Sequence, residues 1–340
     1  MQRKTVLVTG GTGYIGSHTI INLYEHGYLP ISVDNGMNSD ISSLSKIEDI
    51  IGVRIKHYNI DLQDLTKTET IFKEQKIDAI IHFAALKAVG ESVEKPFLYF
   101  RNNLNSLLNV QECAQKYGVK AFIFSSSCTV YGEVKSSPVD EYTELQPAES
   151  PYGRTKQMGE EIIEDCIKKS DMKAVLLRYF NPAGAHLSAK IGESPINTAQ
   201  NLVPVITETA IGNRPCMKVF GNDYDTRDGT CVRDYIHIMD LAEAHTLALD
   251  FALYRQQNQV EVFNLGSGSG YTVLEAINAF ETVNNVKLSY EISARRPGDV
   301  VAIYSSYEKA KNQLYWQPKY GIKEIMQSAW EWEKNRNLTK

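Results

Sequence analysis

The sequence predicts an α/β fold: a doubly wound parallel sheet of the Rossmann type, followed by a smaller C-terminal α/β region. Three observations predict it. Short apolar segments alternate with helix-length segments through the first half of the chain. The apolar segments are continuous rather than alternating, which is typical of parallel strands buried on both faces. A glycine-rich turn joins the first apolar segment to the first helix, as in doubly wound folds.

The expected elements follow in chain order. The expected strands are Lys4–Thr9, Ile31–Val33, Val53–Ile60, Ala79–Ala84, Ala121–Ser125 and Ala174–Tyr179. The expected helices between them are Tyr14–His26, Asp64–Gln75, Phe97–Tyr117 and Tyr152–Lys169.

The pattern changes after Asn181, where loops lengthen and proline, glycine and asparagine become frequent. Further helices are expected near Ile238–Leu253, Val273–Val283 and Ile322–Lys334. We therefore expect residues 1–181 to form the Rossmann domain and residues 182–340 to form mainly a second domain, with some segments returning to the first.

Composition excludes several classes of function. The net charge of -5 argues against binding to nucleic acid or to an anionic membrane. No apolar run approaches the roughly 20 residues that span a bilayer. The five cysteines are scattered without Cys-x-x-Cys spacing, so neither a disulfide framework nor a metal site is expected. Because the chain starts without a signal-peptide pattern, we expect a cytoplasmic protein.

The turn after the first strand predicts a dinucleotide site. Gly10, Gly13 and Gly16 have Gly-x-x-Gly-x-x-Gly spacing, which lets a pyrophosphate approach backbone amides at a helix N-terminus. Asp34 ends the second strand, where a carboxylate accepts hydrogen bonds from ribose hydroxyls and repels a 2′-phosphate. Asn35 follows it without a nearby arginine, so NAD is preferred over NADP. The alternative is a plain tight turn beside a surface acid.

Two further strand ends suit the same cofactor. Asp61 ends the third strand and either accepts a hydrogen bond from the adenine amino group or caps the following helix. The fourth strand ends in His82, Phe83, Ala84 and Ala85, where small side chains permit close approach of the cofactor. His82 is expected to be a satisfied core histidine.

A catalytic trio is predicted at the carboxyl edge of the sheet. Tyr152 and Lys156 lie one helical turn apart, and Ser127 follows the fifth strand. Moving a hydride from an alcohol carbon requires a base that removes the hydroxyl proton, and Tyr152 can be that base only as a phenolate. A free tyrosine has a pKa of about 10, so a neutral pKa requires about three units, or about 4 kcal/mol. The Lys156 ammonium and a positive nicotinamide both favour that phenolate.

With these motifs in place, the chain resembles the extended short-chain dehydrogenases/reductases and, within them, the UDP-glucose 4-epimerase family. The resemblance runs nearly end to end. Its motifs are Thr9–His18, Leu86–Ser92, Ser125–Ser127, Tyr152 with Lys156, Arg178–Pro182, Phe220–Tyr224, Val232–His237 and Arg295–Asp299.

The resemblance implies a reaction of galactose metabolism. UDP-galactose and UDP-glucose interconvert when bound NAD oxidises carbon 4 of the hexose, the 4-keto sugar turns over, and the hydride returns to the other face. NAD is regenerated in each turnover and should stay bound. The resemblance also implies a homodimer formed through the Phe97–Tyr117 and Tyr152–Lys169 helices, as a four-helix bundle.

The predicted site residues fall into two groups. Besides the residues above, the cofactor contacts are Tyr14, Ile15, Leu62, Lys87, Asn102, Ser125, Tyr179 and Phe180, with Tyr152 and Lys156 shared. The UDP-hexose contacts are Ser127, Tyr152, Asn181, Asn201, Leu202, Lys218, Val219, Phe220, Arg233, Arg296, Asp299 and Ile303. Arg233 and Arg296 are expected to clamp the pyrophosphate, and Asp299 to take the ribose hydroxyls. Without the resemblance, the two arginines could be surface ion-pair partners.

Several alternatives remain open at this point. Sugar-nucleotide 4,6-dehydratases place an Asp-Glu pair where this chain has Cys128 and Thr129, so dehydration is disfavoured. Another UDP-sugar, such as a UDP-N-acetylhexosamine or UDP-glucuronate, is the nearest alternative substrate. Ile303 is neither the tyrosine that goes with simple hexoses nor the small residue that admits N-acetyl sugars. A non-catalytic NAD-sensing protein on the same fold is disfavoured because both Tyr152 and Lys156 are present.

Overall fold

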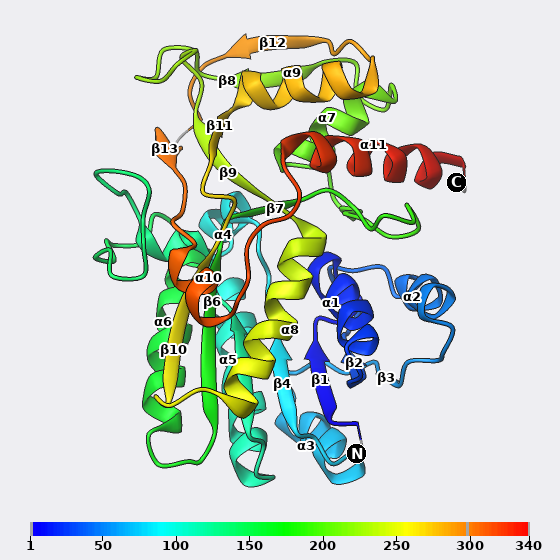
Figure 1. Cartoon of the computed structure of the whole chain (residues 1–340), viewed down its shortest axis with the longest axis vertical. Coiled ribbons are helices and arrows are strands. Elements are labelled where there is room, and N and C mark those ends of the chain that lie inside the picture. The colour runs from blue at the N-terminus through cyan, green and yellow to red at the C-terminus, as the bar shows by residue number, and fades with distance from the viewer. Residues whose placement is uncertain (1–2, 297–298, 339–340) are drawn as a thin grey trace.

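The computed structural model describes residues 3–296 and 299–338 of the 340-residue chain. Its centre is a seven-stranded sheet in the order β10-β6-β5-β4-β1-β2-β3, in which all neighbours are parallel (Figure 1). The strands are β1 (Thr5–Thr9), β2 (Leu29–Val33), β3 (His57–Tyr58), β4 (Ala79–His82), β5 (Ala121–Ser125), β6 (Lys173–Tyr179) and β10 (Val260–Leu265). The chain order reverses between β1 and β4, and ligands of such sheets bind at that point beyond the carboxyl ends of the strands. The predicted doubly wound fold is confirmed.

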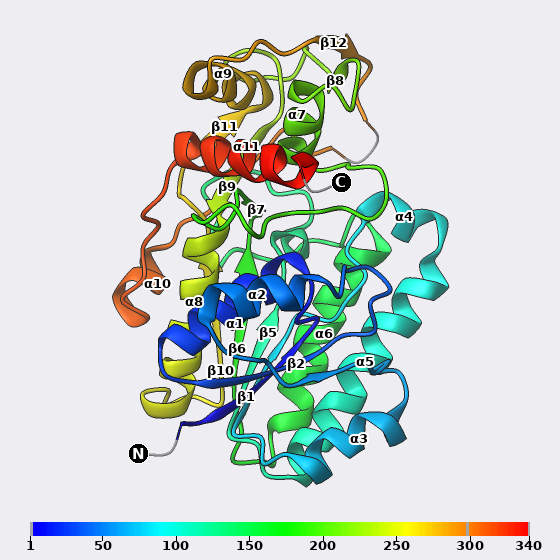
Figure 2. The same ribbon diagram turned by 90° about the vertical axis from the view of Figure 1, so that its right-hand side faces the viewer.

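Helices cover both faces of this sheet, as continuous apolar strands require. One face carries α1 (Tyr14–Glu25), α2 (Ser43–Ile51) and α8 (Ile238–Tyr254). The other carries α3 (Leu65–Glu74), α5 (Pro96–Lys116) and α6 (Pro151–Ile167) (Figure 2). Alternate residues of the central strands enter each core: Val6 and Val8 face the first layer, and Leu7 faces the second.

The remaining elements gather above the carboxyl edge of the sheet (Figure 1). Strands β11 (Gly270–Thr272), β9 (Val232–His237) and β13 (Ala302–Ile303) form a small sheet, and β7 (Asn181–Ala183) also pairs with β9; β8 (Met217–Phe220) pairs with β12 (Tyr290–Ser293). Helices α7 (Leu202–Ala210), α9 (Val273–Asn284) and α11 (Ile322–Leu338) pack around a third apolar core.

The second half of the sequence does not stay in this upper part. Helix α8 packs against α1, β5 and β6, and β10 extends the large sheet beside β6. Helix α10 (Glu308–Gln313) lies against β10. The chain therefore passes repeatedly between the large sheet and the upper part. The division after Asn181 as a functional boundary stays a prediction.

Some expected elements differ from those observed. The strand expected at Val53–Ile60 pairs only at His57 and Tyr58, because it lies at the sheet edge and Arg54 and Lys56 are exposed. Helices α2, α7, α10 and α4 (Val89–Glu94) were not expected. They have six to nine residues, too short for a helical periodicity to stand out. Within the described ranges, no helix is long and apolar enough to cross a membrane.

Candidate active site

The glycine-rich turn brings β1 directly onto the start of α1. Gly10 has φ of 68°, and a Cβ on Gly16 would lie 2.2 Å from the Gly10 carbonyl oxygen. Only glycine therefore closes this turn. Helix α1 starts at Gly13, which offers no side chain to cap the first amides, and Tyr14 and Ile15 supply two of those amides. An uncapped helix N-terminus with free N–H groups fits a pyrophosphate.

Asp34 faces this turn from the end of β2. Its carboxylate accepts hydrogen bonds from the Thr12 amide at 3.2 Å, the Gly36 amide at 3.0 Å and the Ser39 hydroxyl at 2.9 Å. Asn35 turns away to accept from the Met37 amide at 3.0 Å. The structure thus holds a carboxylate beside the glycine turn, where the sequence places the ribose of NAD.

Asp61 does not cap the following helix. The N-cap of α3 is Asp64, which accepts from the Lys67 amide at 3.1 Å. Asp61 instead accepts from the Gln63 amide at 2.9 Å, and the Gln63 side chain also reaches Asn102 Oδ1 at 3.4 Å. Two residues expected at the cofactor are therefore joined through one glutamine. Leu62, beside Asp61, is buried.

The end of β4 closes the other side of the turn. The Ala84 amide donates to Thr9 Oγ1 at 3.1 Å, and a Cβ on Gly10 would come within 3.0 Å of the Ala84 nitrogen. His82 bonds Thr9 Oγ1 through Nδ1 at 2.9 Å, and burial lowers its pKa to about 3. His82 is thus a neutral core residue, while Phe83, Ala84 and Ala85 follow the strand into the site.

The predicted catalytic side chains converge near the carboxyl end of β5. Ser150 caps α6 by accepting from the Gly153 amide at 3.1 Å, which sets Tyr152 in the first turn. Lys156 Nζ lies 5.8 Å from the centre of the Tyr152 ring and donates to the Ser125 carbonyl at 2.5 Å. Ser127 Oγ accepts from the Thr129 amide at 3.2 Å and the Thr129 hydroxyl at 3.0 Å.

Burial dominates the electrostatics of this trio. It lowers the pKa of Lys156 to about 7, although the Glu160 carboxylate acts in the opposite direction. It raises the pKa of Tyr152 to about 12, against the lowering effect of a hydrogen bond with Ser127. Both groups thus favour their neutral forms. A phenolate at Tyr152 therefore has to overcome the cost of burying its charge.

A buried polar network supports the catalytic helix from behind. Arg178 donates to both carboxylate oxygens of Glu160, at 2.9 and 2.6 Å, and both side chains are almost fully buried. Ser126 donates to the same carboxylate at 2.5 Å, and Tyr131 lies under the guanidinium. The sequence analysis missed this network. Its signal was a charged residue, Arg178, inside an apolar strand.

Tyr179 and Phe180 leave β6 beside the trio. The Tyr179 hydroxyl forms a short hydrogen bond with Ser125 Oγ, and burial raises the Tyr179 pKa well above its usual range. Phe180 is buried in a small apolar cluster with Tyr131 and Ile303. The structure therefore brings Ile303 into contact with the same cluster as a predicted cofactor residue.

Lys87 and Asn201 meet at a residue that the sequence analysis did not single out. The Glu193 carboxylate accepts from Lys87 Nζ at 3.3 Å and from Asn201 Nδ2 at 2.8 Å. Lys87 belongs to the loop after β4, and Asn201 is the N-cap of α7, followed by Leu202. A predicted cofactor contact and a predicted substrate contact are thus linked by one carboxylate.

The residues predicted to hold the diphosphate pair with one another. Asp299 Oδ1 accepts from Arg233 at 3.3 Å and from Arg296 at 3.0 Å. Arg296 also lies over the Phe220 ring at 5.5 Å, which links it to β8, the strand of Lys218 and Val219. Pro297 and Gly298, the middle of the Arg295–Asp299 motif, lie outside the described residues.

Asn181 and Ile303 belong to two different strands that pair with β9. Asn181 Nδ2 donates to the Asp234 carbonyl at 2.9 Å. Ile303 pairs with Arg233 in the sheet and is 6% exposed. Across the described part of the chain, no group of three or more His, Cys, Asp or Glu side chains could hold a metal ion.

Comparisons with known proteins agree with this geometry. The family model for GDP-mannose 4,6 dehydratase matches residues 7–329. UDP-glucose 4-epimerase 2 of Arabidopsis thaliana is 48% identical over 336 residues, which cover 98% of this chain and 95% of that protein.

Two solved structures are similar throughout. UDP-glucose 4-epimerase from Bifidobacterium longum, in complex with NAD+ and UDP, superposes with a TM-score of 0.94 at 44% identity, covering 98% of this chain and 99% of that one. UDP-glucose-4-epimerase from Stenotrophomonas maltophila, with bound NAD and formylated UDP-arabinopyranose, gives a TM-score of 0.96 at 40% identity, covering 99% and 100%.

Proposed function

Because the chain belongs to the nucleotide-sugar enzyme family of the GDP-mannose 4,6 dehydratase model and, within it, to the UDP-glucose 4-epimerases, we propose that it interconverts UDP-galactose and UDP-glucose with NAD as cofactor. The observation that carries the proposal is the convergence of Tyr152, Lys156 and Ser127 at the carboxyl end of β5. That edge of the sheet is where a nicotinamide and a sugar meet in this fold.

The site fits NAD on its own residues. The uncapped start of α1 would hold the pyrophosphate, and Asp34 would take the adenosine ribose hydroxyls. Lys156, anchored on the Ser125 carbonyl, is placed to reach the nicotinamide ribose side of the site. When bound, the nicotinamide supplies reversible two-electron chemistry at carbon 4 of the hexose.

Tyr152 is the proposed proton acceptor and donor. Its phenolate would take the proton of the 4-hydroxyl, and its phenol would return that proton after the 4-keto sugar turns in the pocket. Ser127 has its Oγ oriented by two donors from Thr129, and its own hydrogen, directed at Tyr152 in this structure, would donate to the reacting sugar oxygen once the substrate is bound. Protonated Lys156 would stabilise the phenolate, offsetting part of the burial cost that raises the Tyr152 pKa.

The dehydratase reaction that gives the family model its name is not proposed. Eliminating water from the sugar needs an acid at the leaving hydroxyl, and this chain has Cys128 and Thr129 after Ser127. Burial raises the Cys128 pKa to about 12, so the thiol holds its proton and does not act as an acid–base pair near neutral pH.

The UDP half of the substrate is proposed to bind between β9 and the segment around Asp299. Arg233 and Arg296 present fork-shaped donors that match phosphate oxygens. Asp299 accepts hydrogen bonds from both guanidinium groups. On substrate binding it would exchange one of these contacts for the ribose hydroxyls. Asn201, Leu202 and the β8 residues 218–220 are proposed to contact the nucleotide.

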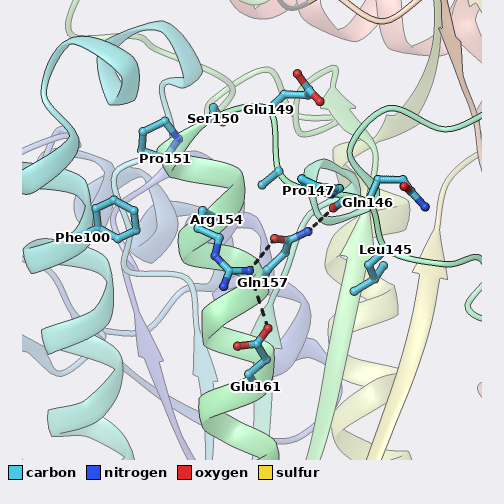
Figure 3. A pocket seen from close by; sticks show the side chains of 11 residues that line it. Phe100, Leu145, Gln146, Pro147, Glu149, Ser150, Pro151, Arg154, Gln157 and Glu161 are labelled. Atoms are coloured by element: carbon cyan, nitrogen blue, oxygen red, sulfur yellow. Dashed lines mark hydrogen bonds and ion pairs between the residues drawn. The ribbon is translucent and has the colours of Figure 1, made fainter.

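A homodimer through α5 and α6 is also proposed. Apolar side chains of α5 lie on the surface, including Phe97 with 76% and Leu108 with 42% exposure. A pocket of about 630 Å³ is lined by Phe100 of α5, Leu145, and Arg154 of α6. Figure 3 shows these side chains around it. A second copy would cover this face as a four-helix bundle. Light scattering at micromolar concentration is expected to give twice the chain mass, and a strictly monomeric mass would contradict the proposal.

We place the protein in the cytoplasm. All five cysteines are free, as expected in a reducing compartment.

Incubation with UDP-galactose, followed by enzymatic detection of UDP-glucose, tests reaction and substrate together. We expect turnover without added NAD, because the cycle regenerates its cofactor and the site should retain it. Analysis of the supernatant after denaturation should therefore find NAD or NADH. No UDP-glucose, or occupancy below about a tenth of the sites together with dependence on added NADP, would refute the proposal.

A further inference from the structure

We propose that Asp234 is a positioning residue for the UDP-sugar half of the site: its carboxylate fixes β9 and β13 and so places Arg233 and Ile303. This inference rests on the proposed function. It concerns a residue that the proposed chemistry does not use and that touches neither the reacting carbon nor the catalytic trio.

The carboxylate of Asp234 is completely buried and receives four hydrogen bonds. Its Oδ1 accepts from the Ser267 amide at 2.7 Å and the Ser267 hydroxyl at 2.6 Å. Its Oδ2 accepts from the Ser305 amide at 3.0 Å and the Ser305 hydroxyl at 2.8 Å. Each carboxylate oxygen therefore accepts hydrogen bonds from both the backbone amide and the hydroxyl of one serine.

These bonds join three separate parts of the chain. Asp234 lies in β9, Ser267 lies two residues after the end of β10, and Ser305 lies two residues after the end of β13. The carbonyl of Asp234 accepts from Asn181 Nδ2 at 2.9 Å, which adds the start of β7. The large sheet and the small sheet are thus tied at the point where the predicted substrate residues emerge.

Strand β13 needs this tie more than the others. It has two residues, and its register with β9 pairs Ala302 with Val232 and Ile303 with Arg233. A pairing this short specifies register weakly. The Ser305 contact with Asp234 lies just beyond it and holds the strand end, while successive residues of β9 place Arg233 on the face opposite Asp234.

The packing around the carboxylate leaves no room for adjustment. A Cβ on Gly266 would lie 2.1 Å from Ser305 Oγ and 2.3 Å from Asp234 Oδ2. Such a contact cannot form without moving the serine or the carboxylate. Glycine at this position therefore allows the end of β10 to approach the Asp234–Ser305 contact closely.

An amide in place of the carboxylate breaks half of this arrangement. Asparagine keeps one acceptor oxygen, but its NH2 group would face the two donors of one serine. The hydroxyl of that serine can turn and accept from the NH2 group, but its backbone amide loses its acceptor and must move away. Arg233, which pairs with Asp299 at 3.3 Å, and Ile303 would then lose their defined positions.

The test compares Asp234→Asn with Asp228→Asn as the matched control. Asp228 also accepts from the amide and the hydroxyl of one residue, Thr230, at 2.9 and 2.7 Å, and through Thr272 it joins the loop before β9 to the start of α9. It has the same charge and similar bonds, but none of these bonds reaches β13, the strand of Ile303. Ser305→Ala is a milder variant, and Gly266→Ala is a purely steric one.

The readouts are the Kd for UDP by calorimetry, KM and kcat for UDP-galactose, and NAD content. We expect Asp234→Asn to weaken UDP binding by about 10–100-fold and to raise KM in parallel, because charge-assisted hydrogen bonds are lost. NAD content and kcat should stay within about threefold, since the trio stands on other elements. Asp228→Asn should leave the Kd for UDP within about threefold.

The outcomes separate this inference from the proposed function. Wild-type protein that binds no UDP and turns over no UDP-galactose refutes the proposed function. Wild-type protein that binds UDP, with an unchanged Kd in Asp234→Asn, overturns only the positioning role, and so does an equal loss in Asp228→Asn. If Asp234→Asn does not fold, Ser305→Ala decides: a Kd raised about 3–10-fold supports the role, and an unchanged Kd overturns it.

Discussion

The two halves of the site hold their polar groups in different ways. In the catalytic half, Lys156, Glu160 and Arg178 are almost fully buried and satisfied by neighbouring protein groups. In the UDP half, the side chains of Lys218 and Arg296 are 60% and 52% exposed and make ion pairs with acids beside them. The first half is thus fixed before any ligand arrives. The second keeps Lys218 and Arg296 largely in water, where an ion pair is weak.

This difference separates chemistry from affinity. Preorganised groups in a buried site act on the transition state and hence on kcat. Exposed cations paired with nearby acids can exchange partners for a diphosphate at low cost, so they act on binding. Substitutions in the catalytic half should therefore change kcat, and substitutions in the UDP half should change KM.

The largest effect is expected in the catalytic half. Tyr152→Phe removes the group that carries the proton and keeps the ring, so kcat should fall about 10²–10⁴-fold. The Kd for UDP should change less than about threefold, because the phenol is proposed to act on the hexose, which UDP lacks. Steady-state kinetics and calorimetry on the same preparation check this. Activity within about threefold of wild type would mean that another group is the base.

The second effect belongs to the UDP half. Arg233→Met removes a guanidinium that is 18% exposed on its side chain, and KM for UDP-galactose should rise up to about 100-fold with little change in kcat. Arg296→Met, at a more exposed position, should raise KM less. Lysine at either position restores the charge without the fork and should recover part of the loss. A fall in kcat with unchanged KM would break the comparison between the halves.

Local sequence patterns predicted the catalytic half better than the buried polar residues that support the site. The glycine turn and the Tyr152–Lys156 pair are contained in short segments whose geometry follows from helix and turn rules. The Glu160–Arg178 pair and the Asp234 carboxylate join residues far apart in the chain, so no spacing reveals them. For the same reason, the return of α8 and β10 to the large sheet could not be placed. The assigned contacts with NAD and UDP-sugar stay predictions.

A smaller effect is expected where the halves meet at the sugar. Ile303 is β-branched and stiff, and it is packed with Phe180 and Tyr131. It offers no hydrogen bond to an acetamide, and an unpaired amide in a closed pocket costs about 1–3 kcal/mol. UDP-galactose should therefore be preferred over UDP-N-acetylgalactosamine by roughly 10–100-fold in kcat/KM. Ile303→Ser should reduce this ratio. Equal kcat/KM values for the two sugars in the wild type would contradict this prediction. An unchanged ratio in the variant would show that Ile303 does not determine the selectivity.

The smallest effect concerns the free energy of unfolding and the contact between α8 and the segment just before α11. Asp240, in the first turn of α8, accepts from the Lys319 and Tyr320 amides through Oδ2 at 3.1 and 3.0 Å. Among the described residues, its Oδ1 has no hydrogen-bond partner. Burial raises its pKa to about 6. An asparagine there would keep the accepting oxygen and place its NH2 where no donor competes.

The sign of the pH dependence follows from the raised pKa. Between about pH 4 and 6 the folded protein binds more protons at Asp240 than the unfolded chain, so wild-type stability falls as pH rises through this window. A shift of about two units corresponds to about 3 kcal/mol, and losing a negative charge near the start of α8 gives back up to about 1 kcal/mol. The NH2 group of the asparagine would lack an acceptor, which costs about 1–3 kcal/mol at either pH. Asp240→Asn should therefore gain at most about 1 kcal/mol at pH 8, or about 2 °C in Tm, and should be less stable relative to the wild type at pH 5 than at pH 8. Scanning calorimetry at both pH values measures the difference. A variant whose stability relative to the wild type is no greater at pH 8 than at pH 5 would contradict the raised pKa of Asp240.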